Sequence, residues 1–147
     1  MKVLVSACLM GRNCKYNGGN NRNAAVLDFV KDKDVVEICP EMLSGLGAPR
    51  KSVELVQGCV RSRDGADFTR EFQEGVRRAM ERIRGEKIDL AVLQSRSPSC
   101  GVRQIYDGTF GKRLIDGQGL FARALSEAGI PLMDAAEVPC AGEENPL

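Results

Sequence analysis

Apolar residues recur along this chain with two different periods, which predict strands and helices in alternation. Short apolar runs at residues 3–5, 35–38 and 88–93 have the length of buried strands. The third run is interrupted only by Asp89, which is typical of parallel strands covered on both faces. A closing strand is expected at residues 131–133.

The clearest helix is predicted over residues 67–84. Its apolar residues recur every three or four positions and therefore share one face: Phe68, Phe72, Val76, Met80 and Ile83. Asp67 is placed to cap the start, and Gly85 to end the helix. Shorter helices are predicted at 24–31 and 120–128.

Polar, glycine-rich stretches at 11–23 and 94–111 are expected to be loops, and residues 53–60 a strand or half of a hairpin. The alternation of strands with helices predicts an α/β fold, with a mainly parallel sheet flanked by helices in a Rossmann-like three-layer arrangement. The 147 residues suit a single compact domain. We expect it to span residues 1–138, with 139–147 as a C-terminal tail.

Composition narrows the choice of partners. The net charge is +1, so no basic excess indicates a nucleic acid or an anionic membrane. No apolar stretch approaches the ~20 residues of a membrane span. The opening MKVLVSACLMGR is expected to be a mature strand rather than a signal peptide, which favours a cytoplasmic protein. Its oligomeric state is left open.

Histidine is absent and cysteine occurs six times. A metal would therefore be held by thiolates or carboxylates, and a proton would be carried by a group other than imidazole. Thiols stay reduced in the cytoplasm, so metal binding or catalysis is a better interpretation of these cysteines than disulfides.

Three cysteines follow predicted parallel strands. Cys8, Cys39 and Cys100 come after the runs VLVSA, VVEI and IDLAVL, and sites in α/β sheets form beyond the carboxyl ends of strands. A single free cysteine is as often a buried core residue, but this shared placement favours a common site. We assign Cys59 to the core and Cys140 to the tail, and leave Cys14 open between a fourth ligand and a residue that shapes the pocket.

Thiolates favour zinc or an iron–sulfur cluster. No CxxC pair of the kind usual in structural zinc sites occurs, and three dispersed thiols suit a cubane cluster with one iron left open. Several neighbours could complete a site: Glu41 as acid or base, Ser97 and Ser99 beside Cys100, Arg50 and Arg96 for a polar substrate, and Tyr106–Phe110 as a pocket wall. Each also has an ordinary role as surface charge or turn residue.

Three separated segments together resemble one small bacterial family, the thiouracil desulfidase-like iron–sulfur proteins, formerly catalogued as a domain of unknown function. The segments are VSACLMGRNCKYNGG, CPEMLSGLGAPR and SRSPSCGVRQIYDGTF, and the resemblance covers the chain from Met1 to about Val138. It implies a [4Fe-4S] cluster held by Cys8, Cys39 and Cys100, with one iron not bound by the protein. It also implies that the cluster is easily lost in air.

The reaction that the resemblance implies is non-redox hydrolysis of a C–S bond. The open iron would take the sulfur of a thiolated base such as thiouracil, Glu41 would activate water, Ser97 would relay a proton, and hydrosulfide would leave. Ser99, Arg50 and Arg96 would contact this small-molecule substrate. The chain departs from the family at Gly47-Ala48, where the family usually has a second proline ahead of the arginine, and this departure concerns the pocket wall rather than the chemistry.

Two other functions remain as alternatives. One is a thiol phosphatase or arsenate reductase, in which a cysteine after the first strand and a nearby arginine cradle an oxyanion. Here the arginine would be Arg12, which is not at the spacing of those enzymes. The other is a non-catalytic metal-binding or cluster-binding module. Absence of turnover despite bound metal would favour this second alternative.

Overall fold

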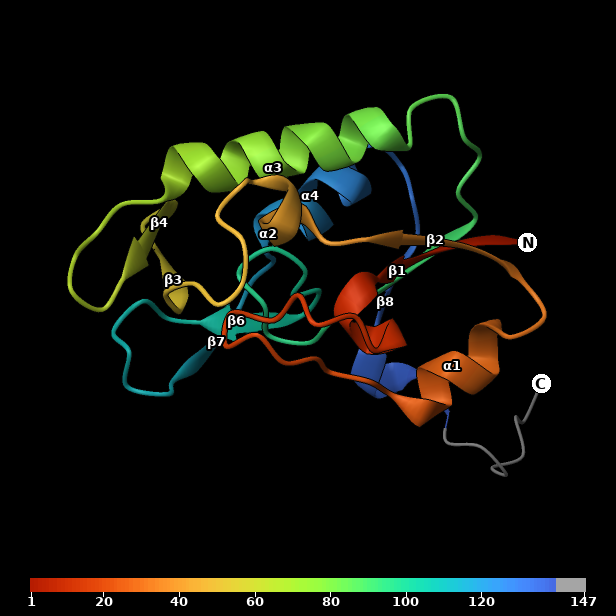
Figure 1. Cartoon of the computed structure of the whole chain (residues 1–147), viewed down its shortest axis with the longest axis horizontal. Helices are drawn as coiled ribbons and strands as arrows, with labels where there is room; N and C mark the ends of the chain where they lie inside the picture. Colours follow the sequence, from red (N-terminus) through yellow and green to blue (C-terminus); the bar gives the residue numbers. More distant parts are fainter. Residues whose placement is uncertain (140–147) are drawn as a thin grey trace.

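A four-stranded parallel sheet lies between two layers of helices in the computed structural model, which describes residues 1–139 (Figure 1). The strand order is β2-β1-β5-β8, and all neighbours are parallel. The strands are β1 (Lys2–Ser6), β2 (Asp34–Ile38), β5 (Leu90–Leu93) and β8 (Leu132–Asp134). The predicted α/β class and three-layer arrangement are therefore confirmed. Cys140 and the tail from residue 140 onward lie outside the described residues.

Alternate residues of β1, one of the two inner strands, face opposite helical layers. Val3 and Val5 of β1 point to one side, where they are fully buried against Val26 and Val30 of helix α1 (Ala24–Val30). Asn23 caps this helix by accepting a hydrogen bond from the Val26 amide at 3.1 Å. The period of two in β1 thus places the first helix on one face of the sheet.

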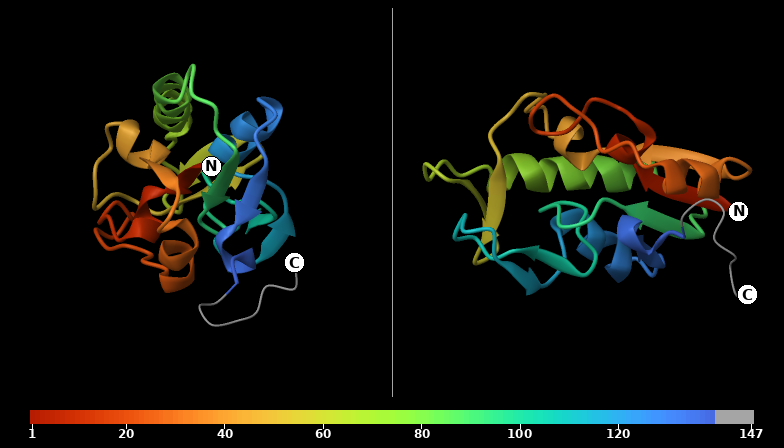
Figure 2. Two further views of the ribbon diagram at one scale, coloured as in Figure 1. Left: turned by 90° about the vertical axis from the view of Figure 1, so that its right-hand side faces the viewer. Right: turned by 90° about the horizontal axis from the view of Figure 1, so that it is seen from below.

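The opposite face is covered by helices α3 (Thr69–Arg82) and α4 (Leu120–Glu127). Leu4 is fully buried there among residues of both helices and the neighbouring strands, and Figure 2 shows both helices on this side. The predicted helix at 67–84 is confirmed over most of its length. It begins at Thr69, and the expected cap is corrected: Phe68 stands at the N-cap without a side-chain cap bond, and Asp67, one residue earlier, accepts the Thr69 amide at 2.8 Å.

Two small antiparallel hairpins stand beyond the carboxyl ends of the sheet. They are β3 (Val53–Val56) with β4 (Cys59–Ser62), and β6 (Gln104–Tyr106) with β7 (Leu114–Asp116). The first confirms the hairpin alternative for residues 53–60. The second corrects the expectation of a plain loop at 94–111, because strands of three residues leave no readable alternation. Glu54 joins the hairpins by accepting the amides of Gly108 and Phe110 at 3.0 and 3.1 Å.

The short helix α2 (Pro40–Leu43) was not predicted, although proline at its first position is a common helix start. It packs closely on α3, where Gly75 leaves room for the Pro40 carbonyl. A Cβ atom at Gly75 would lie 2.1 Å from that oxygen. A glycine in the middle of α3 therefore determines where the segment after β2 can lie. No helix within residues 1–139 is long and apolar enough to cross a membrane.

Candidate active site

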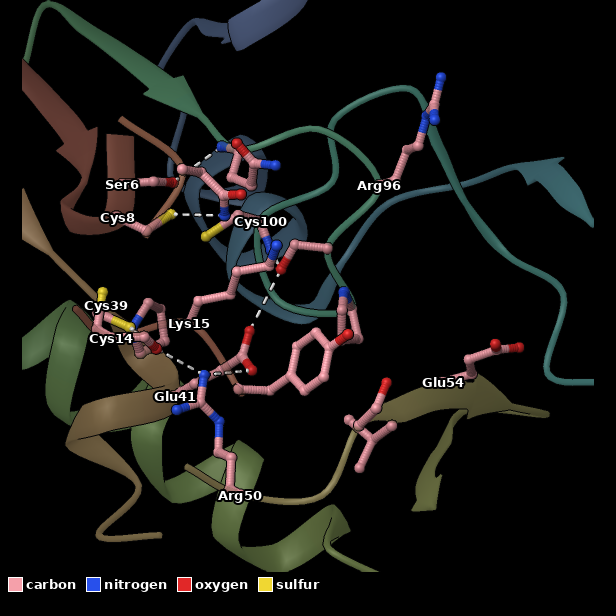
Figure 3. A pocket seen from close by; sticks show the side chains of 18 of the residues that line it. Ser6, Cys8, Cys14, Lys15, Cys39, Glu41, Arg50, Glu54, Arg96 and Cys100 are labelled. Atoms are coloured by element: carbon pink, nitrogen blue, oxygen red, sulfur yellow. Dashed lines mark hydrogen bonds and ion pairs between the residues drawn. The ribbon is translucent and has the colours of Figure 1, made fainter. Parts of the chain in front are cut away.

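A cavity of about 670 Å³ opens beyond the carboxyl ends of β1, β2 and β5 (Figure 3). Residues that follow these strands form its floor, which we define as Cys8, Cys39, Glu41, Ser97 and Cys100. Residues around the hairpins form its mouth, which we define as Arg63, Arg96, Phe110 and Lys112. The volume falls within the range of small-molecule sites.

The three cysteines singled out from the sequence all line this one cavity. Cys8 lies in the single-turn helix η1 (Ala7–Met10), which follows β1 directly. Cys39 stands between β2 and α2, and Cys100 follows the loop after β5. These cysteines are at least 31 positions apart in the sequence. They meet because parallel strands end at the same edge of the sheet.

A fourth thiol, Cys14, also lines the cavity and shifts the pKa values of Cys8 and Cys39. Hydrogen bonding to Cys14 lowers the pKa of Cys8 to about 7, although burial acts in the opposite direction. The same partner lowers the pKa of Cys39. Hydrogen bonding with Cys39 and Cys8 raises the pKa of Cys14 itself. The arrangement therefore makes the thiols of Cys8 and Cys39 more acidic than usual and that of Cys14 less acidic.

Cys100 has a different environment. Its side chain is buried, and this burial raises the pKa of its thiol well above the usual value. Cys8, by contrast, is partly exposed and accepts a hydrogen bond from the Asn21 amide group at 3.5 Å. The loop at 11–23 folds back over Cys8, since the Asn21 backbone N–H also donates to the Cys8 carbonyl at 3.0 Å. Sequence reasoning missed Asn21 because only the folded loop brings it to Cys8.

Glu41 and Ser97 form a hydrogen-bonded pair in the floor. The Ser97 hydroxyl donates to Glu41 Oε2 at 3.3 Å, and its oxygen accepts the backbone amides of Ser99 and Cys100 at 3.1 and 3.0 Å. The two incoming N–H groups leave the hydroxyl proton directed toward Glu41. Ser97 is thus oriented by the turn that also carries Cys100.

Arg50 lines the cavity, but its side chain is nearly buried: Nη1 and Nη2 are bonded to protein acceptors, and Nε is buried without a hydrogen-bond partner among the described residues. Its Nη2 donates to Glu41 Oε1 at 3.0 Å and to the Cys14 carbonyl at 2.9 Å, and only 6% of its side chain is exposed. Figure 3 shows its guanidinium group beside the Glu41 carboxylate. The substrate contact expected of Arg50 stays a prediction, since the residue lines the cavity while its Nη1 and Nη2 are bonded to the protein.

The other two predicted substrate contacts differ from each other. Ser99 is fully buried, lies outside the cavity lining, and its hydroxyl has no hydrogen-bond partner among the described residues. Arg96 does line the cavity, but at the exposed mouth, where its backbone has a φ of 63°. Of the three, only Arg96 is placed where a ligand entering from solvent would pass.

Residues 106–110 were expected to form a wall of the pocket, and two of them do line the cavity. Tyr106 and Phe110 line the cavity, and Arg63 lies over the Phe110 ring at 5.6 Å from its centroid. Lys15, which sequence reasoning did not single out, also extends into the cavity (Figure 3). A lysine directly after a cysteine in a glycine-rich loop offered no periodic signal by which to find it.

The phosphatase alternative required Arg12 to face an anion beside Cys8. Instead, Arg12 Nε donates to Glu37 Oε1 at 2.9 Å on the protein surface, and 68% of the arginine side chain is exposed. Arg12 does not line the cavity. This geometry gives no oxyanion cradle around Cys8.

Among residues 1–139, no group of three Cys, Asp or Glu side chains is arranged to hold one metal ion. The three floor cysteines line the cavity from separate strand ends, and thiolates are the usual ligands of iron–sulfur clusters.

Comparison with known proteins shows which family and which solved structure the chain resembles. A family model described as 2-thiouracil desulfurase matches residues 3–137. The uncharacterized protein YbbK of Bacillus subtilis (strain 168) is 32% identical over 146 residues, covering 92% of this chain and 97% of that protein. The solved structure of the [4Fe-4S]-dependent thiouracil desulfidase TudS is similar with a TM-score of 0.85 at 31% identity, covering 94% of this chain and 93% of the other.

Proposed function

The chain belongs to the 2-thiouracil desulfurase family, and we propose that it is an enzyme that removes sulfur from a thiolated nucleobase such as thiouracil by hydrolysis. One observation carries the proposal. The three strand-end thiols and the hydrogen-bonded pair of Glu41 and Ser97 line the same cavity. Soft ligands and a proton carrier thus face one space, as a metal-assisted hydrolysis requires.

We assign Cys8, Cys39 and Cys100 as the ligands of a [4Fe-4S] cluster. Two features of the thiols support this assignment: their chemistry suits iron, and all three line one cavity at the ends of parallel strands. Three protein ligands would leave one iron without a protein ligand. When bound, the cluster would supply a Lewis acid that polarises the thiocarbonyl group.

Glu41 is proposed as the general base. Its carboxylate lies in the floor, two residues from Cys39, and each of its oxygens keeps one acceptor position after bonding to Arg50 and Ser97. A water that donates to this position would lose its proton to Glu41 as it attacks the carbon. Carboxylates perform such transfers where histidine is absent, as it is in this chain.

Ser97 is proposed to move a proton between Glu41 and the substrate. For this transfer the hydroxyl would turn from Glu41 to a ring nitrogen and release one of its two backbone N–H groups, so that its oxygen takes the proton of the protonated carboxyl as it gives up its own. The reaction balances without a change of oxidation state. Thiouracil and water give uracil, hydrosulfide and a proton, with the C–S bond replaced by a C–O bond.

The test is anaerobic purification, followed by iron and acid-labile sulfide analysis and by measurement of uracil formed from 2-thiouracil. We expect about four irons and four sulfides per chain and turnover in the wild type. Glu41→Gln should keep the iron and lose 10²- to 10⁴-fold in kcat, the usual contribution of a general base. Glu127→Gln, an exposed change on α4, is the matched control.

Two results would count against the proposal. A wild-type protein that binds iron but does not convert thiouracil would favour the non-catalytic binding module. Full activity in Glu41→Gln would remove Glu41 as the base while leaving the cluster assignment intact.

A further inference from the structure

Arg50 joins two segments that are separate in sequence, residues 14–16 and residues 41–50. Its Nη1 donates to the Gly47 carbonyl at 2.9 Å, and its Nη2 donates to the Cys14 carbonyl and to Glu41 Oε1. Its backbone N–H adds a fourth link, to the Tyr16 carbonyl at 2.6 Å. One residue therefore fastens the loop that follows Cys8 to the segment that carries Cys39 and Glu41.

These contacts occupy both ends of the guanidinium group. Nη1 and Nη2 are each bonded to protein acceptors, Nε is buried without a partner among the described residues, and the side chain is 6% exposed. Its carboxylate partner Glu41 is also mostly buried, since only 16% of that side chain is exposed. A bidentate substrate contact by Arg50 would require breaking a charge-assisted bond inside the protein, which is among the stronger polar interactions.

The Glu41 carboxylate is consequently held from two sides. Arg50 binds Oε1 and Ser97 binds Oε2, and two bonds on different oxygens define the plane of the carboxylate. Ser97 donates from a short turn that is itself fixed by the amides of Ser99 and Cys100. The direction of the remaining acceptor positions thus depends on Arg50 as well as on Ser97.

We infer that Arg50 is a positioning residue for Glu41, rather than the substrate ligand that the sequence suggested. The inference rests on the proposed function, because it gives Arg50 its role through the base of that reaction. Arg50 aligns the carboxylate with the attacking water and keeps it in place during turnover. Misplacement of a reacting group by about 1 Å is enough to cost on the order of a hundredfold in rate.

The kinetic test separates kcat from KM in Arg50→Met and Arg50→Lys, both purified without air and assayed with 2-thiouracil. Arg50→Met should keep wild-type iron content and a KM within about threefold, and lose roughly a hundredfold in kcat. Arg50→Lys keeps the charge with a single donor group and should recover part of this loss. Arg123→Met, which removes an exposed arginine paired with Glu127, is the matched control and should behave as wild type.

A double variant tests whether Arg50 acts through Glu41. Arg50→Met should lower kcat little further in a Glu41→Gln background, because the group it positions is already absent. Multiplicative losses would overturn the inference. So would a large rise in KM with kcat retained, which is the result expected of a substrate ligand.

A structural readout keeps this inference separate from the proposed function. In crystals of Arg50→Met, the Glu41 carboxylate should leave its bond to Ser97, whereas it should stay in Arg50→Lys. A carboxylate that is unmoved in Arg50→Met would overturn the inference, whether or not the wild type converts thiouracil. If Arg50→Met fails to bind the cluster, Arg50→Lys decides: a raised KM overturns the inference, and a lowered kcat at constant KM supports it.

Discussion

The floor and the mouth of the cavity are built by different means. The floor stands on the ends of parallel strands, and its groups are buried or partly buried and bonded to one another, as Ser97 is to Glu41 and Glu41 to Arg50. The mouth stands on loops beside two small hairpins, and its arginines and Lys112 are exposed. Arg96, Phe110 and Lys112 all have φ between 59° and 63°, a left-handed conformation that non-glycine residues rarely adopt.

This difference indicates a division of labour between the two regions. Groups in a buried, hydrogen-bonded setting have fixed positions and stronger electrostatic interactions, which suits bond-making chemistry. Exposed charges are screened by solvent and contribute little individually. Substitutions in the floor should therefore have large effects and those in the mouth small ones, and four experiments test this expectation.

The largest effect is expected from loss of a floor thiol. Cys39→Ser should reduce bound iron and acid-labile sulfide to near zero and abolish conversion of thiouracil, because serine is a poor ligand for soft metals. Cys59→Ser is the matched control, since Cys59 lies in β4 and does not line the cavity. Equal iron loss in both variants would mean that the thiols act through folding rather than as ligands.

A smaller effect is expected at Ser97. Ser97→Ala removes the donor to Glu41 and the acceptor of two backbone amides, so kcat should fall roughly a hundredfold at normal iron content. Ser126→Ala, an exposed change on α4, should leave kcat as in wild type. Steady-state kinetics with 2-thiouracil would check both, and unaltered kcat in Ser97→Ala would remove the proton relay.

Stability offers a third contrast between the regions. A Cβ atom at Gly119 would lie 2.4 Å from the Ser99 carbonyl carbon, directly behind the turn that carries Ser97 and Cys100. Gly119→Ala should therefore lower the free energy of unfolding by about 2 kcal/mol. Gly111→Ala, near the mouth, meets only the Thr109 side chain and should change it by less than about 0.5 kcal/mol. Thermal unfolding of both variants measures the difference, and equal melting temperatures would contradict it.

The smallest effect is expected at Arg63. Its guanidinium lies over the Phe110 ring and donates to the Phe110 carbonyl at 3.1 Å, both at an exposed position. Arg63→Ala should cost about 0.5 kcal/mol of stability, as exposed cation–π contacts do, and change kcat/KM for thiouracil by less than about threefold. A loss comparable to that of Ser97→Ala would show that the mouth shares directly in the chemistry.

The sequence predicted the fold and the floor for related reasons. Hydrophobic periodicity identified the four sheet strands and three of the helices, and the strand ends then placed Cys8, Cys39 and Cys100 at one edge. Both inferences use regularities of the backbone that do not depend on distant contacts. The hairpin β6–β7 lacked such regularity, since its strands have three residues each and take their register from Glu54 and from pairing with each other.

By itself, then, the sequence determined the α/β class, the placement of three thiols at the strand ends and the presence of Glu41 and Ser97 near two of them. Only the tertiary structure decided what each polar side chain contacts. Arg50 and Ser99 looked like substrate contacts in the sequence, yet one is bonded to Glu41 and the other is buried outside the cavity. The physical reason is that strand direction follows from local patterns, whereas the partner of a side chain depends on segments brought close by folding.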